Sequence, residues 1–186
     1  MASDDELAAE ADQLARLLRS RNLRAVFAES CTAGLVSATL ARTPGISDQL
    51  CGSAVAYRDA TKQCWLNVSA ADLGPSGPGP VSSEVAVEMA EGVLRITPEA
   101  DLAASVTGHL GPDAPEPLDG LMFTAVAIRG DEQGGPPASV RVQDFRLREV
   151  DTAAENSDGN SLRVARQRAA AQTVLQFVRV SIEEVF

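Results

Sequence analysis

Cysteine is scarce in this chain of 186 residues, and long apolar runs are missing. The three cysteines, Cys31, Cys51 and Cys64, share no Cys-x-x-Cys spacing, which indicates neither a disulfide framework nor a zinc site. No apolar stretch approaches the ~20 residues of a membrane-spanning helix. The first residues are acidic and polar, unlike a secretory signal. We therefore expect a reduced, cytoplasmic protein.

Histidine and lysine are equally rare, with one His, His109, and one Lys, Lys62, the latter among 16 basic residues. A single histidine and scattered carboxylates supply neither a metal ligand set nor a His/Asp pair for a catalytic triad. Lysine can lose its proton when it is desolvated and act as a base, whereas arginine effectively cannot. Lys62 is therefore a candidate base, with a solvated surface charge as the alternative. We expect no metal and no other cofactor.

The net charge of −10 argues against nucleic acid or an anionic membrane as the main partner. A small anionic ligand remains compatible with this charge, because the field inside a pocket need not follow the total.

Helical and strand patterns alternate along the chain. Apolar periodicity predicts helices near residues 4–22, 35–41, 59–65, 83–95 and 161–180. Small apolar and β-branched runs predict strands near residues 23–28, 51–57, 100–106, 121–128 and 140–147. This order predicts an α/β fold, a three-layer α/β/α sandwich with a mixed, partly parallel sheet, in a single domain over residues 1–186. Ligands of such sheets bind beyond the C-terminal ends of the strands.

One stretch, Ala28-Glu29-Ser30-Cys31-Thr32-Ala33-Gly34, joins a predicted strand to a predicted helix. A turn of hydroxyl residues and glycine places backbone N–H groups and hydroxyls at a helix N-terminus, which suits an anion such as phosphate. Ser30, Thr32 and Gly34 are therefore candidate substrate contacts. The alternative is that Ser30 or Thr32 is a simple helix N-cap.

Two further groups of residues could carry chemistry. Ser47 lies in a turn, and Tyr57 and Lys62 follow the second predicted strand. Serine as nucleophile with lysine as base is a known variant of triad chemistry. A plain turn residue, a strand-end aromatic and a solvated charge are the alternatives. The other group is the loop Thr107-Gly108-His109-Leu110-Gly111-Pro112-Asp113, in which His109 could equally be exposed without a role.

The set of motifs resembles the C-terminal domain of the competence/damage-inducible CinA family over residues 29 to about 127. The resemblance is carried by Glu29-Ser30-Cys31-Thr32-Ala33-Gly34, Pro44-Gly45-Ile46-Ser47, Tyr57 with Lys62, Val81-Ser82-Ser83-Glu84, Glu88-Met89-Ala90-Glu91-Gly92, and Val106-Thr107-Gly108 with Gly111-Pro112.

This resemblance implies a metal-independent nicotinamide-nucleotide amidohydrolase, which converts nicotinamide mononucleotide to nicotinate mononucleotide and ammonia. It implies Ser47 in the nucleophile's position, with Lys62 and Tyr57 as its activating partners. It also implies that Ser30 and Thr107 line the site, together with Gly108, which follows Thr107. The expected partner is a small-molecule nucleotide, and we expect a homo-oligomer.

The sequence departs from the family pattern before its last helix, where the usual Gly-Asp-Arg reads Gly159-Asn160-Ser161. We therefore expect the phosphate-binding arginine to be Arg163 or Arg166, which are three residues apart and lie near the same helix face. Two alternative functions remain open: a catalytically inactive nucleotide-binding or regulatory module, and an amidase on another small amide.

Overall fold

A mixed sheet of five strands forms the centre of the computed structural model, which describes residues 4–130, 135–147 and 159–185. The strand order is β2-β1-β3-β4-β5. β1 pairs in parallel with β2 and β3, whereas β4 pairs antiparallel with both β3 and β5. The strands are β1 (Ala25–Glu29), β2 (Leu50–Val55), β3 (Leu102–Gly108), β4 (Leu121–Ile128) and β5 (Ser139–Arg146).

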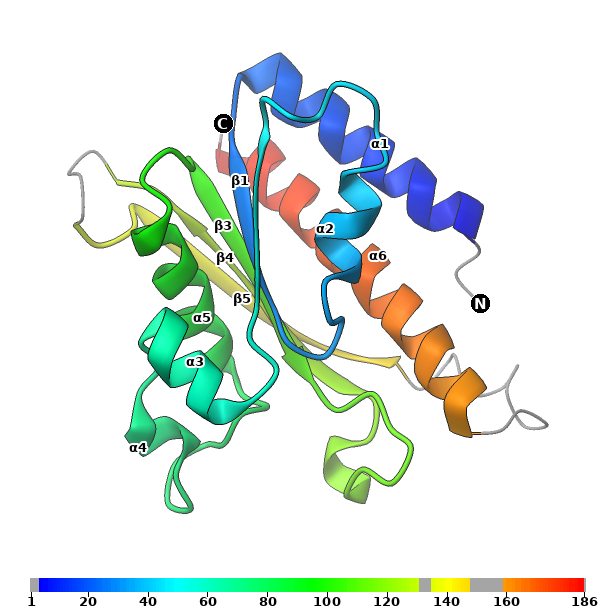
Figure 1. Ribbon diagram of the computed structural model, residues 1–186, viewed down its shortest axis with the longest axis vertical. Helices are drawn as coiled ribbons and strands as arrows, with labels where there is room; N and C mark the ends of the chain where they lie inside the picture. Colours follow the sequence, from blue (N-terminus) through cyan, green and yellow to red (C-terminus); the bar gives the residue numbers. More distant parts are fainter. Residues whose placement is uncertain (1–3, 131–134, 148–158, 186) are drawn as a thin grey trace.

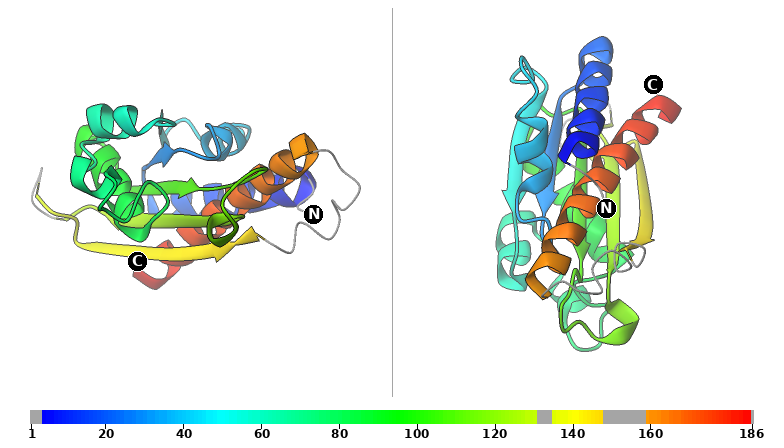
Figure 2. Two further views of the ribbon diagram at one scale, coloured as in Figure 1. Left: turned by 90° about the horizontal axis from the view of Figure 1, so that it is seen from below. Right: turned by 90° about the vertical axis from the view of Figure 1, so that its right-hand side faces the viewer.

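Helices cover both faces of this sheet (Figures 1 and 2). One face carries α1 (Asp4–Arg21), α2 (Leu35–Leu40) and α6 (Gly159–Val185), and the other carries α3 (Asp59–Leu66), α4 (Ala70–Leu73) and α5 (Ser83–Ile96). Alternate residues of β1 enter two separate cores: Phe27 packs with the α1–α6 side, and Val26 packs with the α5 side. The three-layer α/β/α prediction with a mixed sheet is confirmed.

The predicted elements are all present, with small shifts at their ends. Ser82 is the N-cap of α5, because its Oγ accepts the Val85 N–H at 3.3 Å. Asp59 is the first residue of α3, and Arg58 before it makes no side-chain cap bond. Helix α4 and the 3₁₀ turn Glu116–Leu118 were not predicted, since helices of three or four residues show no periodicity.

The C-terminal ends of the parallel strands β1, β2 and β3 lie at the same end of the sheet, at the bottom of Figure 1. Backbone hydrogen bonds join the residues that follow them: Ser30 N–H donates to the Val106 carbonyl at 3.0 Å, and Ala56 N–H donates to the Glu29 carbonyl at 2.8 Å. Helix α6 begins at the same end of the sheet. The motifs around Ser30, Tyr57 and Thr107 are thus brought to one end of the molecule, whereas Ser47 precedes β2.

Candidate active site

A cavity of about 280 Å³ lies beyond the C-terminal ends of β1 and β3, where ligands of α/β sheets bind. Residues from the ends of β1 and β3, the start of α3, the segment before α5 and the first turns of α6 line it. They are Ser30, Cys31, Tyr57, Asp59, Lys62, Pro80, Val81, Thr107, Gly108, His109, Leu110, Gly111, Pro112, Asp113 and Arg163. The structure therefore brings together six of the predicted site residues: Ser30, Tyr57, Lys62, Thr107, Gly108 and Arg163.

Ser30 occupies a sharp turn between a buried strand and a helix. The Ala33 N–H donates to the Ser30 carbonyl at 3.1 Å, which closes the turn, and Ala33 has the left-handed φ of 54° that this path requires. The Cys31 and Thr32 N–H groups donate to no other residue in the described part of the chain. A serine followed by backbone N–H groups that no other described residue accepts from has the arrangement of a nucleophile with oxyanion donors beside it.

The carboxylate of Glu29, next to Ser30, is buried and accepts five hydrogen bonds of 2.8 to 3.1 Å. The donors are the Thr32 hydroxyl, the Val36 N–H, the Ser37 N–H and hydroxyl, and the Ser53 hydroxyl. Two of these are first-turn amides of α2, so the positive end of that helix already holds an anion. Sequence reasoning missed Glu29, although a carboxylate that ends an apolar strand was a visible signal.

The Thr32 hydroxyl and Gly34 therefore do not make the predicted substrate contacts. The Thr32 hydroxyl is bound to Glu29 and is buried, and neither residue lines the cavity. Gly34 is the N-cap of α2, and its φ of 96° is in the left-handed region that favours glycine. Both residues shape the turn on which Ser30 sits.

Lys62 is 2% exposed, although it carries the only lysine ammonium of the chain. Its Nζ lies 3.4 Å from the Tyr57 carbonyl oxygen and 3.4 Å from Asp59 Oδ1. Both contacts are long for hydrogen bonds of a charged donor. The predicted desolvation of Lys62 is confirmed, and the surface-charge alternative is wrong.

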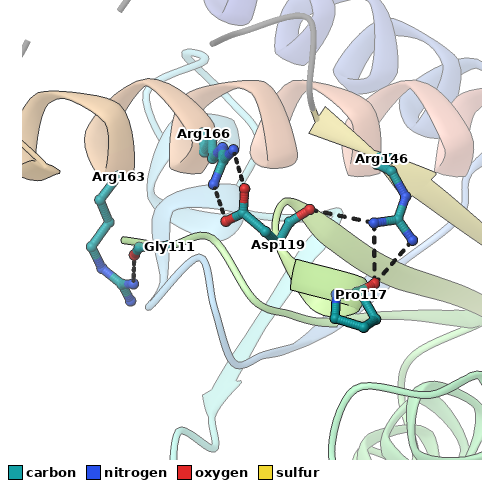
Figure 3. Close-up of polar contacts among 6 residues, drawn as sticks. All are labelled: Gly111, Pro117, Asp119, Arg146, Arg163 and Arg166. Carbon is teal, nitrogen blue, oxygen red and sulfur yellow. Dashed lines mark hydrogen bonds and ion pairs between the residues drawn. The ribbon is translucent and has the colours of Figure 1, made fainter. Parts of the chain in front are cut away.

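The two candidate arginines of α6 have different environments (Figure 3). Arg163 lines the cavity and donates to the Gly111 carbonyl at 2.7 Å and to the Tyr57 hydroxyl at 2.6 Å. Arg166 is fully buried and forms a two-point ion pair with Asp119, at 2.7 and 2.9 Å. The structure therefore places only Arg163 at the cavity, and Arg166 fixes the loop before β4.

Thr107 and Gly108 lie where β3 reaches the cavity. The Thr107 hydroxyl donates to the Pro80 carbonyl at 2.6 Å. A Cβ at Gly108 would come within 2.8 Å of the Leu121 carbonyl oxygen, so β4 passes too close for any side chain there. These residues shape the cavity wall through their backbone.

Cys31 and His109 also line the cavity. Burial raises the pKa of the Cys31 thiol to about 12, so the thiol stays protonated at neutral pH and is a poor nucleophile. His109 is half-buried, which favours a role at the site over the alternative of a solvent-exposed histidine without a role.

The structure does not bring Ser47 to Lys62. Ser47 is exposed, and it lines a different hollow of about 330 Å³ with Arg24, Asp48 and Glu99. It precedes β2, whereas Tyr57 and Lys62 follow it, and six strand residues at ~3.3 Å each separate the two ends by about 20 Å. The predicted Ser47–Lys62 pair is therefore wrong on geometry, and Ser30 is the serine that shares the cavity with Lys62.

No group of three or more His, Cys, Asp or Glu side chains that could hold a metal ion occurs in residues 4–130, 135–147 and 159–185. Within the same ranges, no helix has the length and apolar character needed to cross a membrane.

Comparison with known proteins places this architecture in a family. The family model described as "CinA C-terminal domain" matches residues 7–146. The chain belongs to the CinA C-terminal domain family. Within it, the chain is 38% identical over 139 residues to a "CinA-like protein" of Syntrophotalea carbinolica, covering 74% of this chain and 31% of that protein. A "CinA-like protein" of Dictyoglomus thermophilum is 41% identical over 117 residues, covering 62% of this chain and 28% of that protein.

Solved CinA structures share the fold over nearly the whole chain. The crystal structure of "competence/damage inducible protein CihA" from Agrobacterium tumefaciens has a TM-score of 0.77 and 26% identity, covering 96% of both chains. The "competence damage-inducible protein A (ComA)" from Klebsiella pneumoniae has a TM-score of 0.78 and 23% identity, covering 97% of this chain and 99% of that one. The chain spans about three tenths of the length of the curated CinA-like relatives it matches.

Proposed function

We propose that this CinA domain is a cytoplasmic, metal-independent amidohydrolase that converts nicotinamide mononucleotide to nicotinate mononucleotide and ammonia. The observation that carries the proposal is the buried Lys62 in one cavity with Ser30, whose turn has two backbone N–H groups that donate to no other described residue. Family membership supports the nucleotide as substrate. Ser30 replaces Ser47 as the proposed nucleophile.

In the proposed reaction, Lys62 Nζ takes the hydroxyl proton of Ser30 while Ser30 Oγ attacks the carboxamide carbon. The Cys31 and Thr32 N–H groups stabilise the negative oxygen of the tetrahedral intermediate. Lys62 then gives its proton to the leaving nitrogen, and the C–N bond breaks to release ammonia. Water hydrolyses the acyl-Ser30 ester by the same steps and releases the nicotinate product.

Arg163 is the proposed contact for the substrate phosphate. The acceptors that the described residues supply to it are a backbone carbonyl and the Tyr57 hydroxyl, and neither is a carboxylate, so they leave the guanidinium charge to act on an anion in the cavity. Arginine binds phosphate through charge-assisted, two-point hydrogen bonds. The N-terminus of α2, which the sequence suggested for the phosphate, already holds the Glu29 carboxylate.

Ammonia release from nicotinamide mononucleotide and nicotinamide riboside tests both parts of this proposal. We expect Arg163→Ala to raise KM for the nucleotide about ten- to a hundredfold and to change KM for the riboside little. Arg168→Ala, on the same helix but outside the cavity lining, is the control.

Binding of the mononucleotide without ammonia release would favour the regulatory module. Ammonia release from other amides alone would favour a different amidase. An equal effect of Arg163→Ala on both compounds would place the phosphate contact elsewhere.

A further inference from the structure

Three side chains on the first turns of α6 reach three different segments of the site. Arg163 binds Tyr57 and Gly111, Arg166 binds Asp119, and Gln167 Nε2 donates to the Cys31 carbonyl at 3.1 Å. Their spacing of three and four residues places them on one helix face. Gln167 does not line the cavity, so its contact acts on the turn that follows Ser30.

The Cys31–Thr32 peptide is the central peptide of the turn that Ser30 and Ala33 close. Turns of type I and type II differ by a flip of this central peptide, and a type II turn requires a positive φ at its third residue. Thr32 is not among the residues with positive φ, so the turn has the type I orientation. In a trans peptide the carbonyl and the N–H point in opposite directions.

We propose that Gln167 is a positioning residue, which holds the Cys31 carbonyl toward α6 and so keeps the Thr32 N–H available for the oxyanion at Ser30. A flip of this peptide would replace the donor by a carbonyl oxygen and repel the oxyanion. The inference rests on the proposed function, because it needs Ser30 as the nucleophile. The partly buried Gln167 itself touches no reacting atom.

Two substitutions separate the Gln167 hydrogen bond from the shape of its side chain. Gln167→Glu keeps the shape but replaces the donor by a carboxylate, and Gln167→Met removes the donor without adding a charge. Gln176→Glu and Gln176→Met, on an exposed position of the same helix, are the matched controls. Circular dichroism and Tm verify that each variant is folded.

We measure kcat and KM for ammonia release from nicotinamide mononucleotide, together with the rate at which phenylmethanesulfonyl fluoride modifies Ser30, read by peptide mass. The modification forms an Oγ–S bond, releases fluoride and passes the hydroxyl proton to the base, so it probes the same oxyanion donors without the substrate. We expect both Gln167 variants to lower kcat about 10- to 100-fold and to slow the modification. KM in Gln167→Met should stay within about twofold.

Unchanged kcat and unchanged modification of Ser30 in both Gln167 variants would overturn the role of Gln167. A rise in KM with kcat unchanged would also overturn it. If the wild type releases no ammonia from the mononucleotide but the variants still slow Ser30 modification, the Gln167 inference stands and the proposed substrate fails. If wild-type Ser30 is neither modified nor active, both proposals fail.

Discussion

Glu29 and Ser30 are neighbours in the chain, but only Ser30 faces the cavity. The sequence indicated an anion site at this turn, because serine, threonine and glycine lie between a strand and a helix, although a simple helix N-cap fitted the same pattern. It could not show that the buried Glu29 carboxylate takes the helix N-terminus for itself. That arrangement depends on the strand direction and on Ser53 of the neighbouring strand, which are properties of the fold.

Substitutions of Lys62 distinguish a catalytic base from a fixed positive charge. We expect Lys62→Arg to lower kcat about 10²- to 10⁴-fold, nearly as much as Lys62→Ala, because arginine does not give up its proton near neutral pH. Steady-state kinetics with Tm as the folding control provide the measurement. An arginine variant that keeps most of its turnover would remove Lys62 as the base.

The buried Cys31 thiol should make the stability of the protein depend on pH. Its pKa of about 12 in the folded protein exceeds the ~8.5 of an unfolded thiol, so above pH ~9 only the unfolded state loses the proton. This stability is present below pH ~9 and is lost as the pH rises toward 12. Between pH 8 and 10 the wild type should lose about 1–2 kcal/mol more unfolding free energy than Cys31→Ala, measured in urea. The exposed Cys64→Ala is the control, and equal losses in all three proteins would contradict the burial argument.

Among the secondary-structure elements, sequence patterns were sufficient for the helices and strands of five residues or more. They could not give the close approaches between elements, because these depend on where two backbones meet. Helix α3 carries Lys62, and its last residue, Leu66, packs against Gly92 of α5. A Cβ added at Gly92 would lie 2.1 Å from the Leu66 carbonyl oxygen. Arg95 of α5 donates to the same carbonyl at 3.0 Å.

Gly92→Ala tests this approach with a clear sign. Alanine in a helix interior normally stabilises by about 1 kcal/mol relative to glycine. Here we expect a net loss of about 1–3 kcal/mol, because the methyl group must push α3 away. Activity should fall as well, since α3 carries Lys62. Chemical denaturation and kcat provide the measurements, and a more stable variant would show that α3 does not pack this closely.

In the whole molecule, the alternation of helices and strands predicted the layers, and six of the predicted site residues line the cavity. The error concerned which end of the sheet each serine occupies. Ser30 and Ser47 both lie in short polar turns next to a strand, so their local patterns are alike. The predicted strand 51–57 already separated Ser47 from Lys62, and the structure places Lys62 at the cavity and Ser47 in a different hollow.

Ammonia release from nicotinamide mononucleotide in Ser30→Ala and Ser47→Ala, with Tm measured for both, determines which serine is the nucleophile. Each change removes one hydroxyl from a turn and should alter stability little. We predict that Ser30→Ala lowers kcat by at least about 10³-fold and that Ser47→Ala stays within about twofold of the wild type. Loss of turnover in Ser47→Ala, with Ser30→Ala still active, would show that Ser47 and not Ser30 is the nucleophile.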